Sequence, residues 1–243
     1  MQLYGLENTK EFELACYALI PAAGSGTRFR AEQPKQYLAL AGKPMLWHAV
    51  ASVCVAPVQN VFVVLAPEDR EFARHDWSAF AGKLEPLYCG GETRRDSVYN
   101  GLVAAMAAVD ADDWMLVHDA ARPCLPKRDL ESLIAETRED SIGGILALPT
   151  AETVKKAAKD EIGTLRIAGT EDRSQLWLAQ TPQMFRCGLL AQALKAAKGV
   201  VTDEAGAVEQ MGLKPRLVAG SRENIKVTFP EDLKIAEAIL AKR

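Results

Sequence analysis

The sequence predicts an α/β sandwich with a largely parallel sheet. Short apolar runs alternate along the chain with amphipathic stretches, in a repeating order of strand, helix, strand. The chain has 243 residues, 49% of them hydrophobic, which suits one large domain or two small ones. In such sheets ligands bind at the carboxyl ends of the strands. The residues directly after each predicted strand are therefore the first candidates for a functional site.

The individual elements follow from the hydrophobic pattern and its breaks. Strands are predicted at residues 15–21, 61–66, 84–89, 114–118, 144–148, 176–179 and 216–219. Helices are predicted at residues 43–55, 68–80, 94–109, 127–139, 187–197, 204–211 and 231–242. These elements form one predicted domain, residues 15–243, preceded by an N-terminal extension, residues 1–14.

One segment, residues 149–172, breaks this order. It is polar, with several lysines and a turn expected at Gly163. Its flanks, residues 152–156 and 164–168, can pair as a hairpin. The segment is therefore predicted to be a β-arm that protrudes from the sheet.

The composition excludes several classes of function. The net charge of −3 gives no global basic field, so nucleic acid is not an expected partner. The five cysteines are scattered without CxxC spacing, and the three histidines lack metal-ligand spacing, so neither disulfides nor a zinc site are expected. No stretch approaches the roughly 20 apolar residues of a membrane span, and residues 1–14 do not resemble a signal peptide. A cytoplasmic location is expected.

A glycine-rich loop follows the first predicted strand, with the sequence Pro21-Ala22-Ala23-Gly24-Ser25-Gly26-Thr27-Arg28. Its two glycines allow backbone N–H groups to approach an anion closely. Arg28 and, shortly after it, Lys35 add two cations beside the same loop, which suits a polyphosphate. A Walker A loop would need Gly-Lys-Ser/Thr here, and a dinucleotide-binding loop would need a small residue at Phe29.

Six motifs, in order, resemble those of the 2-C-methyl-D-erythritol 4-phosphate cytidylyltransferases. The first is the glycine-rich loop followed by Pro34-Lys35-Gln36-Tyr37. The others are Gly90-Gly91 with Arg94, Asp96-Ser97-Val98 and Gly101-Leu102; Val117-His118-Asp119-Ala120-Ala121-Arg122-Pro123; Gln180-Thr181-Pro182-Gln183; Thr202-Asp203-Glu204-Ala205; and Asn224-Ile225-Lys226-Val227-Thr228. The resemblance extends from about Tyr17 to the C-terminus.

The resemblance implies a Rossmann-like nucleotide-binding fold, CTP as co-substrate, Mg²⁺ as cofactor and a homodimer. It implies transfer of a cytidylyl group to a sugar-alcohol phosphate in the non-mevalonate isoprenoid pathway, with release of pyrophosphate. By matching positions, the nucleotide would be held by Pro21, Ala22, Ala23, Gly24, Gly26, Arg28, Lys35, Gly91, Glu92 and Ser97. The sugar phosphate would be faced by Asp119, Arg122, Thr153, Arg173, Thr181 and Lys226.

Glu92, Glu152, Gly206 and Phe229 depart from the family pattern. They leave the acceptor open between methylerythritol phosphate and a pentitol phosphate such as ribitol 5-phosphate.

The residue types suit this chemistry. A phosphate monoester has its second pKa near 6, so it is largely dianionic at neutral pH and needs no general base. The reaction then depends on positioning and on stabilising charge, which is the role expected of Arg28 and Lys35. A lysine inside a strand such as Lys226 usually faces solvent, and the resemblance is what implies that it is a catalytic residue that binds phosphate or substrate. Asp119, at the carboxyl end of a predicted strand, is the expected magnesium ligand. The DxD at residues 110–112 precedes its strand and is predicted to be a solvated turn.

Three other functions are considered. An NAD-dependent oxidoreductase needs an acidic residue about 20 positions beyond the glycine loop, and residues 39–53 contain none. A glycosyltransferase needs a DxD after a strand, which this chain lacks. A non-catalytic nucleotide sensor would bind CTP without releasing pyrophosphate, and remains a remote alternative.

Overall fold

The computed structural model describes residues 14–24 and 33–243. The strands are β1 (Cys16–Pro21), β2 (Ala39–Leu40), β3 (Lys43–Pro44), β4 (Val58–Val64), β5 (Leu84–Leu87), β6 (Trp114–Val117), β7 (Gly143–Pro149), β8 (Lys155–Lys159), β9 (Leu165–Thr170), β10 (Trp177–Arg186) and β11 (Arg216–Ala219). The α-helices are α1 (Met45–Val53), α2 (Arg94–Ala105), α3 (Lys127–Thr137), α4 (Cys187–Ala196), α5 (Glu204–Glu209) and α6 (Pro230–Leu240). Short 3₁₀ turns are η2 (Lys35–Tyr37), η3 (Phe72–Arg74), η4 (Ser78–Phe80) and η5 (Arg173–Gln175).

The central sheet has seven strands in the order β11-β7-β10-β6-β1-β4-β5. All neighbouring pairs are parallel except those made by β10, which runs antiparallel to both β6 and β7. The predicted mostly parallel α/β sheet is confirmed. The parallel order β6-β1-β4-β5 brings the carboxyl ends of four strands to one edge.

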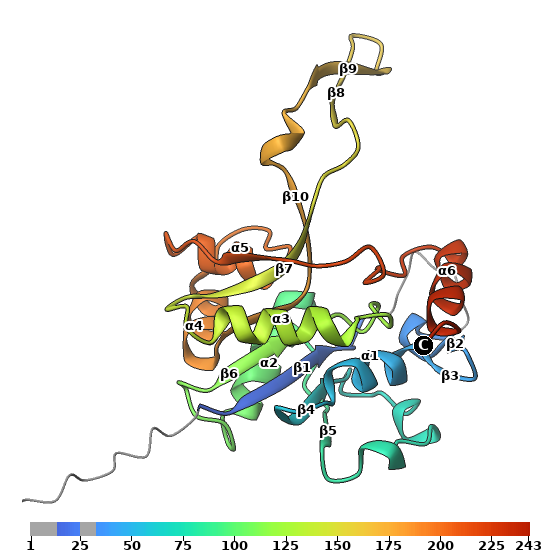
Figure 1. The fold of residues 1–243 in the computed structure, drawn as a ribbon, viewed down its shortest axis with the longest axis vertical. Helices are drawn as coiled ribbons and strands as arrows, with labels where there is room; N and C mark the ends of the chain where they lie inside the picture. The colour runs from blue at the N-terminus through green and yellow to red at the C-terminus, as the bar shows by residue number, and fades with distance from the viewer. Residues whose placement is uncertain (1–13, 25–32) are drawn as a thin grey trace, which may run out of the picture.

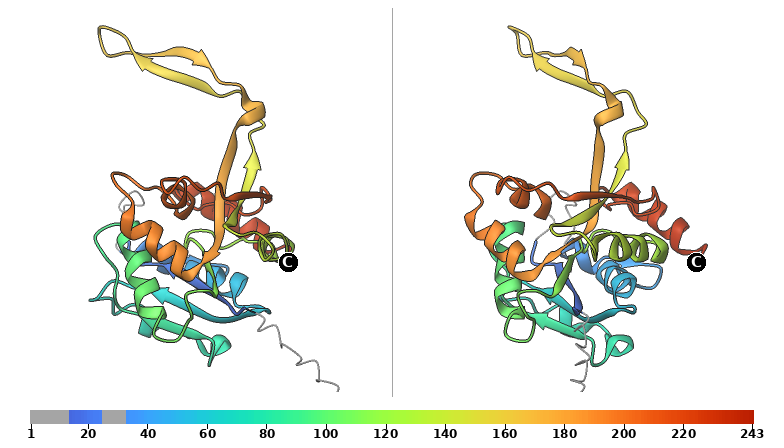
Figure 2. Two further views of the ribbon diagram at one scale, coloured as in Figure 1. Left: turned by 90° about the vertical axis from the view of Figure 1, so that its left-hand side faces the viewer. Right: turned by 60° about the vertical axis from the view of Figure 1, so that its left-hand side comes forward.

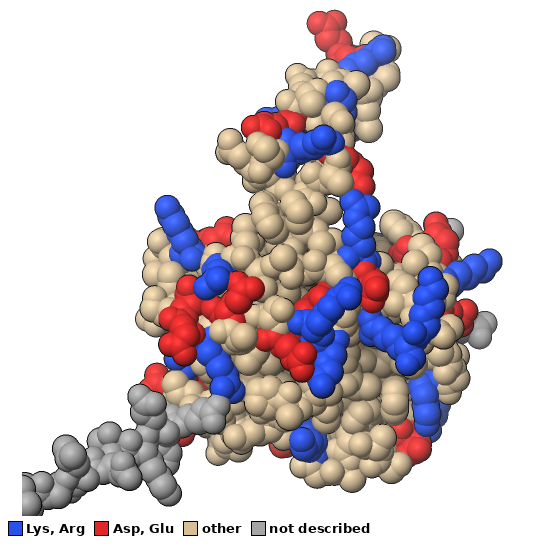
Figure 3. Space-filling model, viewed as in Figure 1, with Lys and Arg blue, Asp and Glu red and all other residues tan. Residues whose placement is uncertain are grey.

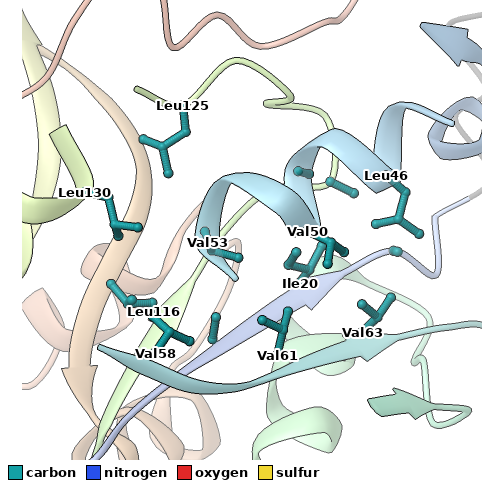
Figure 4. Close-up of a cluster of buried hydrophobic side chains, with 14 of the residues drawn as sticks. Ile20, Leu46, Val50, Val53, Val58, Val61, Val63, Leu116, Leu125 and Leu130 are labelled. Carbon is teal, nitrogen blue, oxygen red and sulfur yellow. The ribbon is translucent and has the colours of Figure 1, made fainter. Parts of the chain in front are cut away.

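Helices cover both faces of the sheet, so the fold has three layers (Figures 1 and 2). The alternation of side chains along β1 explains why: Ala18 and Ile20 pack in one core, and Leu19 packs in the other. Helices α1 and α3 cover the first face, and α2, α4 and α5 cover the second. Figure 4 shows side chains of α1, among them Val50, directed at Ile20 and its neighbours on the sheet. Burial on both faces is why these strands are apolar throughout.

One predicted helix, residues 68–80, is wrong. The structure has only the two turns η3 and η4 there. The carboxylate of Asp69 accepts hydrogen bonds from the N–H groups of Glu71 and Phe72, and Asp76 accepts one from Ser78. Such side-chain acceptors compete with helical backbone bonds and favour turns.

The arm is a hairpin in which β8 and β9 pair antiparallel. Its strands lie a few residues further along the chain than the sequence predicted. Strand β10 is also longer than predicted, because it continues from the base of the arm into the sheet (Figure 1). The hairpin stands away from the sheet in every view, and nearly all of its residues are exposed (Figure 2).

Candidate active site

A cavity of about 430 Å³ lies at the carboxyl edge of β1 and β6. It is lined by Pro21, Ala22, Ala23, Gly24, Lys35, Gln36, Met45, Gly91, Glu92, Thr93, Arg94, Ser97, Asp119, Ala120, Ala121 and Lys226. Ten of these residues are site candidates that the sequence predicts. Because five separate parts of the chain supply them, the fold and not the local sequence brings them together.

The glycine pair after β5 is fixed against the first loop. A Cβ atom on Gly90 would lie 2.3 Å from the Cβ of Ala23 and 2.8 Å from the carbonyl oxygen of Leu65. The N–H of Gly91 donates to the hydroxyl of Ser97 at 3.1 Å. Glycine is therefore needed here for close approach of two backbones, and Ser97 holds the loop at the cavity wall.

Helix α2 begins shortly after these glycines in the chain, and its first turn has a capping box. Thr93 accepts a hydrogen bond from the N–H of Asp96, and the Asp96 carboxylate accepts one from the N–H of Thr93. This reciprocal cap fixes the start of the helix and hence the direction of Arg94, its first residue.

Lys35 is positioned by its own turn and by the C-terminal part of the chain. Its ammonium group donates to the carbonyl oxygen of Val227 at 2.8 Å. The neighbouring Gln36 donates to the carbonyl oxygen of Ala22 at 2.7 Å, and Tyr37 donates to Asp69 at 2.8 Å. The Gln36 bond holds the Lys35 turn against the base of the glycine-rich loop, and the other two bonds tie the turn to Val227 and Asp69.

Asp119 is the anionic centre of the site. Its Oδ1 lies 2.9 Å from Arg94 Nη2, its Oδ2 lies 2.7 Å from Lys226 Nζ, and Arg122 Nε is 4.0 Å from Oδ2. Burial alone would raise the pKa of this carboxyl, but the charges of Arg94, Lys226 and Arg122 outweigh burial and hold the pKa far below its usual range. Asp119 is thus a carboxylate at every physiological pH.

His118 orders the turn that carries Asp119. Its Nε2 lies 2.9 Å from the carbonyl oxygen of Arg122, and its Nδ1 lies 3.1 Å from the hydroxyl of Thr181. The Thr181 hydroxyl also accepts the N–H of Asp119 at 2.9 Å. Burial lowers the pKa of His118 to about 4, so the ring is neutral at pH 7. A neutral ring that donates from Nε2 and accepts at Nδ1 satisfies all these bonds.

A second, smaller cavity of about 200 Å³ adjoins the first. Arg94, Asp119 and Lys226 line both cavities, and Arg122 and Thr181 line only the smaller one. The Asp119–Lys226 ion pair therefore lies where the two cavities meet. Two anionic ligands, one in each cavity, would be brought together at this pair.

Two of the described candidate residues are not assembled with the others. Thr153 and Arg173 are exposed at the base of the arm and line none of the cavities described above; Arg173 donates to the carbonyl oxygen of Ala151. Gly26 and Arg28 lie outside the described residues.

The sequence pattern missed the role of Arg94 and Glu204. Both residues stand in motifs of the family, yet the sequence predicts no site role for either. Arg94 joins Asp119 to Glu204, which lies 110 positions later. The sequence holds one signal for Glu204. This glutamate belongs to a family motif and stands at the start of a short predicted helix.

The DxD segment has a structural role. Asp113, just after it, accepts hydrogen bonds from the N–H groups of Ala15 and Asp110. It therefore ties the turn to the amino end of β1, away from the cavity, as the sequence predicted.

Among residues 14–24 and 33–243 no helix is long and apolar enough to cross a bilayer.

Comparison with known proteins identifies the family. The family model of 2-C-methyl-D-erythritol 4-phosphate cytidylyltransferase (IspD) matches residues 16–242. A relative of that name from Dechloromonas aromatica is 55% identical over 229 residues, covering 93% of this chain and 98% of the relative.

Solved structures agree with the sequence comparison. A crystal structure of 4-diphosphocytidyl-2C-methyl-D-erythritol synthase is 39% identical with a TM-score of 0.80, covering 93% of this chain and 98% of that one. The Francisella tularensis 2-C-methyl-D-erythritol 4-phosphate cytidylyltransferase is 37% identical with a TM-score of 0.74, covering 93% and 99%. On the family model, the identities and the shared fold, this chain belongs to the 2-C-methyl-D-erythritol 4-phosphate cytidylyltransferase family.

Proposed function

We propose that this protein joins CTP to 2-C-methyl-D-erythritol 4-phosphate, giving 4-diphosphocytidyl-2-C-methyl-D-erythritol and pyrophosphate in the non-mevalonate pathway. The observation that carries the proposal is the meeting of two cavities at the Asp119–Lys226 ion pair. The larger cavity has the glycine-rich wall that a nucleotide triphosphate needs. The smaller one is lined by the arginine and hydroxyl groups that suit a phosphate monoester.

The reaction is attack of an acceptor phosphate oxygen on the α-phosphate of CTP, with pyrophosphate leaving. The nucleophile is already ionised, so the protein has to position two anions and stabilise the charge that develops. Lys35 and Lys226 both line the larger cavity, and Arg28 adjoins the same loop in sequence. We assign these three cations to the stabilisation of charge on the phosphates.

The nucleotide would lie along the backbone of Ala22, Ala23, Gly24 and Gly26, with its base near Gly91, Glu92 and Ser97. The acceptor would lie near Asp119, Arg122 and Thr181. Arg122 is held in place because Nη1 donates to the carbonyl oxygen of Asn224 at 2.6 Å. Its Nε is buried without a hydrogen-bond partner and lies 4.0 Å from Asp119 Oδ2, so the guanidinium is held beside the Asp119 carboxylate.

Magnesium is the proposed cofactor. No group of three His, Cys, Asp or Glu side chains suited to a metal occurs in residues 14–24 and 33–243, so the protein alone forms no magnesium cage. One carboxylate with phosphate oxygens and water is a usual magnesium environment, and Asp119 fits it. Since Oδ1 is held by Arg94, the available oxygen is Oδ2, and Lys226 would have to move toward a phosphate. The bound ion would neutralise phosphate charge.

A homodimer is part of the proposal. The hairpin of β8 and β9 exposes Ile162, Leu165 and Ile167, and two strands alone bury too little surface to be stable. A second subunit packed on the arm would cover these side chains in a two-fold arrangement. Thr153 and Arg173 would then complete the acceptor pocket of the partner subunit.

The cellular setting proposed is the cytoplasm. All five cysteines are free thiols, as expected in a reducing compartment. Small anions rather than nucleic acid are the proposed partners, because acidic and basic side chains are interspersed on the face seen in Figure 3.

Pyrophosphate release tests the function. The purified protein is incubated with CTP and a panel of acceptor phosphates, with and without Mg²⁺. The proposal expects release with methylerythritol phosphate that depends on Mg²⁺. Faster turnover with ribitol 5-phosphate would reassign the acceptor, and CTP binding without turnover with any acceptor would identify a nucleotide sensor.

A further inference from the structure

Glu204 is a fully buried carboxylate next to the proposed site. It lies in the first turn of α5, and its exposed side-chain fraction is 1%. Its Oε1 accepts from Arg94 Nη1 at 2.6 Å, and its Oε2 accepts from Arg94 Nη2 at 3.0 Å. This is the fork-to-carboxylate geometry that fixes an arginine in one orientation.

The same guanidinium also holds Asp119. Arg94 Nε donates to Asp119 Oδ1 at 3.0 Å, and Nη2 lies 2.9 Å from the same oxygen. All three nitrogens of a rigid planar group are thus used, and both contacts to Asp119 go to one oxygen. The other oxygen, Oδ2, lies 2.7 Å from Lys226 Nζ, whose side chain is 48% exposed, and 4.0 Å from Arg122 Nε.

The start of helix α5, which carries Glu204, is itself fixed by hydrogen bonds. The Asp203 carboxylate caps α5 by accepting the N–H of Gly206, and it also accepts from Gln183 Nε2 at 2.9 Å. The N–H of Ala205 donates to Gln183 Oε1 at 2.8 Å, and Gln183 is buried on β10. Glu204 is therefore tied to the central sheet on both sides of its position in the sequence.

We propose that Arg94 and Glu204 form a positioning pair for the transfer reaction, which fixes Asp119 Oδ1 and leaves Oδ2 facing the substrates and Lys226. The inference rests on the proposed function. Glu204 matters because it occupies the far side of the guanidinium. Without that carboxylate, the Arg94 fork is free to pair with both oxygens of Asp119, which would take Oδ2 away from Lys226.

If Arg94 and Glu204 served only the stability of the fold, a different experimental result would be expected. Replacing a buried ion pair by apolar residues of similar volume is often neutral or stabilising, so stability alone does not require Arg94 and Glu204. The double variant Arg94→Met/Glu204→Leu should accordingly fold, yet its Asp119 would lack the anchor. A stable but slow enzyme is the result that separates positioning from stability.

The experiment compares wild type, Arg94→Lys, Glu204→Gln, their combination and the apolar double variant. Arg95→Lys is the matched control, because Arg95 is the next residue of α2 and pairs with Asp96 outside the cavity. Folding is checked by urea unfolding, and CTP affinity by calorimetry. Turnover is measured as pyrophosphate release with saturating CTP and acceptor.

We expect kcat to fall by about 10–100-fold in both single variants, since misplacement of a reacting group by about 1 Å costs rates of this order. The Kd for CTP should stay within about threefold of wild type, and Arg95→Lys should have wild-type kcat. Because the two residues act as a unit, the combination of the single variants should be no slower than the slower single variant.

Three results would overturn the proposed positioning role of Arg94 and Glu204. They are a folded Arg94→Lys or Glu204→Gln variant with kcat within threefold of wild type, single losses that multiply in the combination, and an apolar double variant with full turnover. Wild type supplies the check on the function itself. If the wild type is active and the variants are unaffected, only the positioning role of Arg94 and Glu204 is rejected. If the wild type itself is inactive, the proposed function is rejected, and the positioning role with it.

Discussion

The ammonium group of Lys35 donates a 2.8 Å hydrogen bond to the backbone carbonyl oxygen of Val227, 192 positions later in the chain. Val227 is itself buried against α6 and donates its N–H to the carbonyl oxygen of Ala121. The bond therefore connects the turn after the glycine-rich loop with the segment that carries Lys226. Two of the three proposed cationic residues thus have a common structural support.

Lys35→Ala should lower turnover by at least about a hundredfold, because loss of one group that stabilises transition-state charge typically costs on the order of 10²–10³ in rate. Arg28→Ala is expected to have an effect of the same size. The measurement is pyrophosphate release by protein shown to be folded. Lys43→Ala is the control, since Lys43 is exposed and pairs with Asp76 away from the cavity. Near-wild-type turnover of folded Lys35→Ala would remove this lysine from the mechanism.

Asp119→Asn should slow turnover and raise the magnesium concentration needed for half-maximal rate, because the variant loses the charge that Oδ2 offers a metal. Titration of Mg²⁺ at saturating CTP measures both effects. Asp112→Asn, in the solvated turn at the amino end of β6, is the matched control. An Asp119→Asn enzyme with an unchanged magnesium titration would leave Asp119 as the partner of Arg94 and Lys226 only.

Two inactive variants should restore activity when mixed in one dimer. Lys35→Ala and Arg173→Ala are each expected to be inactive as homodimers. In the heterodimer, one site would combine an intact Lys35 with an intact Arg173 from the other chain, giving up to half of wild-type turnover per dimer. Co-expression with two affinity tags isolates the heterodimer for assay. If the purified heterodimer stays inactive, Arg173 does not serve the partner subunit.

His118 should make stability depend on pH in a defined window. Its pKa is about 4 in the folded chain, because of burial, and about 6.5 when unfolded. Its stabilising contribution is therefore complete above about pH 6.5 and lost as the pH falls toward 4, by a free energy of unfolding on the order of 3 kcal/mol. Urea unfolding at pH 7, 6 and 5 measures this slope.

The matched variant is His118→Gln, which has no ionisable group at this position. Its free energy of unfolding should depend less steeply on pH than that of wild type between pH 6.5 and 4.5. Equal slopes for the two proteins would mean that His118 takes up its proton with a normal pKa in the folded chain.

Gly143→Ala should destabilise the fold by about 3 kcal/mol through backbone strain and overpacking. Gly143 has φ +112°, and an added Cβ would lie 2.2 Å from the carbonyl oxygen of Met184 on the adjacent strand β10. Gly169→Ala is the control, because an added Cβ there meets nothing within 4 Å. Urea unfolding compares the two, and equal stability would show that β7 and β10 separate at little cost.

Much of the site could be predicted because its signals are local in sequence. Glycines 24, 90 and 91 and the cations near them stand directly after predicted strands, and a parallel sheet brings such positions to one edge. Lys35, Asp119 and Lys226 do line one cavity. The helix predicted at residues 68–80 is wrong because Asp69 and Asp76 satisfy backbone N–H groups locally, which hydrophobic periodicity does not reveal.

The strands of the central sheet, the order of the motifs and the family could be predicted from the amino-acid sequence, since periodicity and motif spacing are properties of short segments; the short strands β2 and β3 and the full length of β10 could not. Which charges are paired depends on the folded chain. Arg94 and Glu204 lie 110 positions apart and meet because α2 and α5 pack on the same face of the sheet. Ion pairing depends on distances of a few ångströms and on burial from water, and both exist only once the chain has folded.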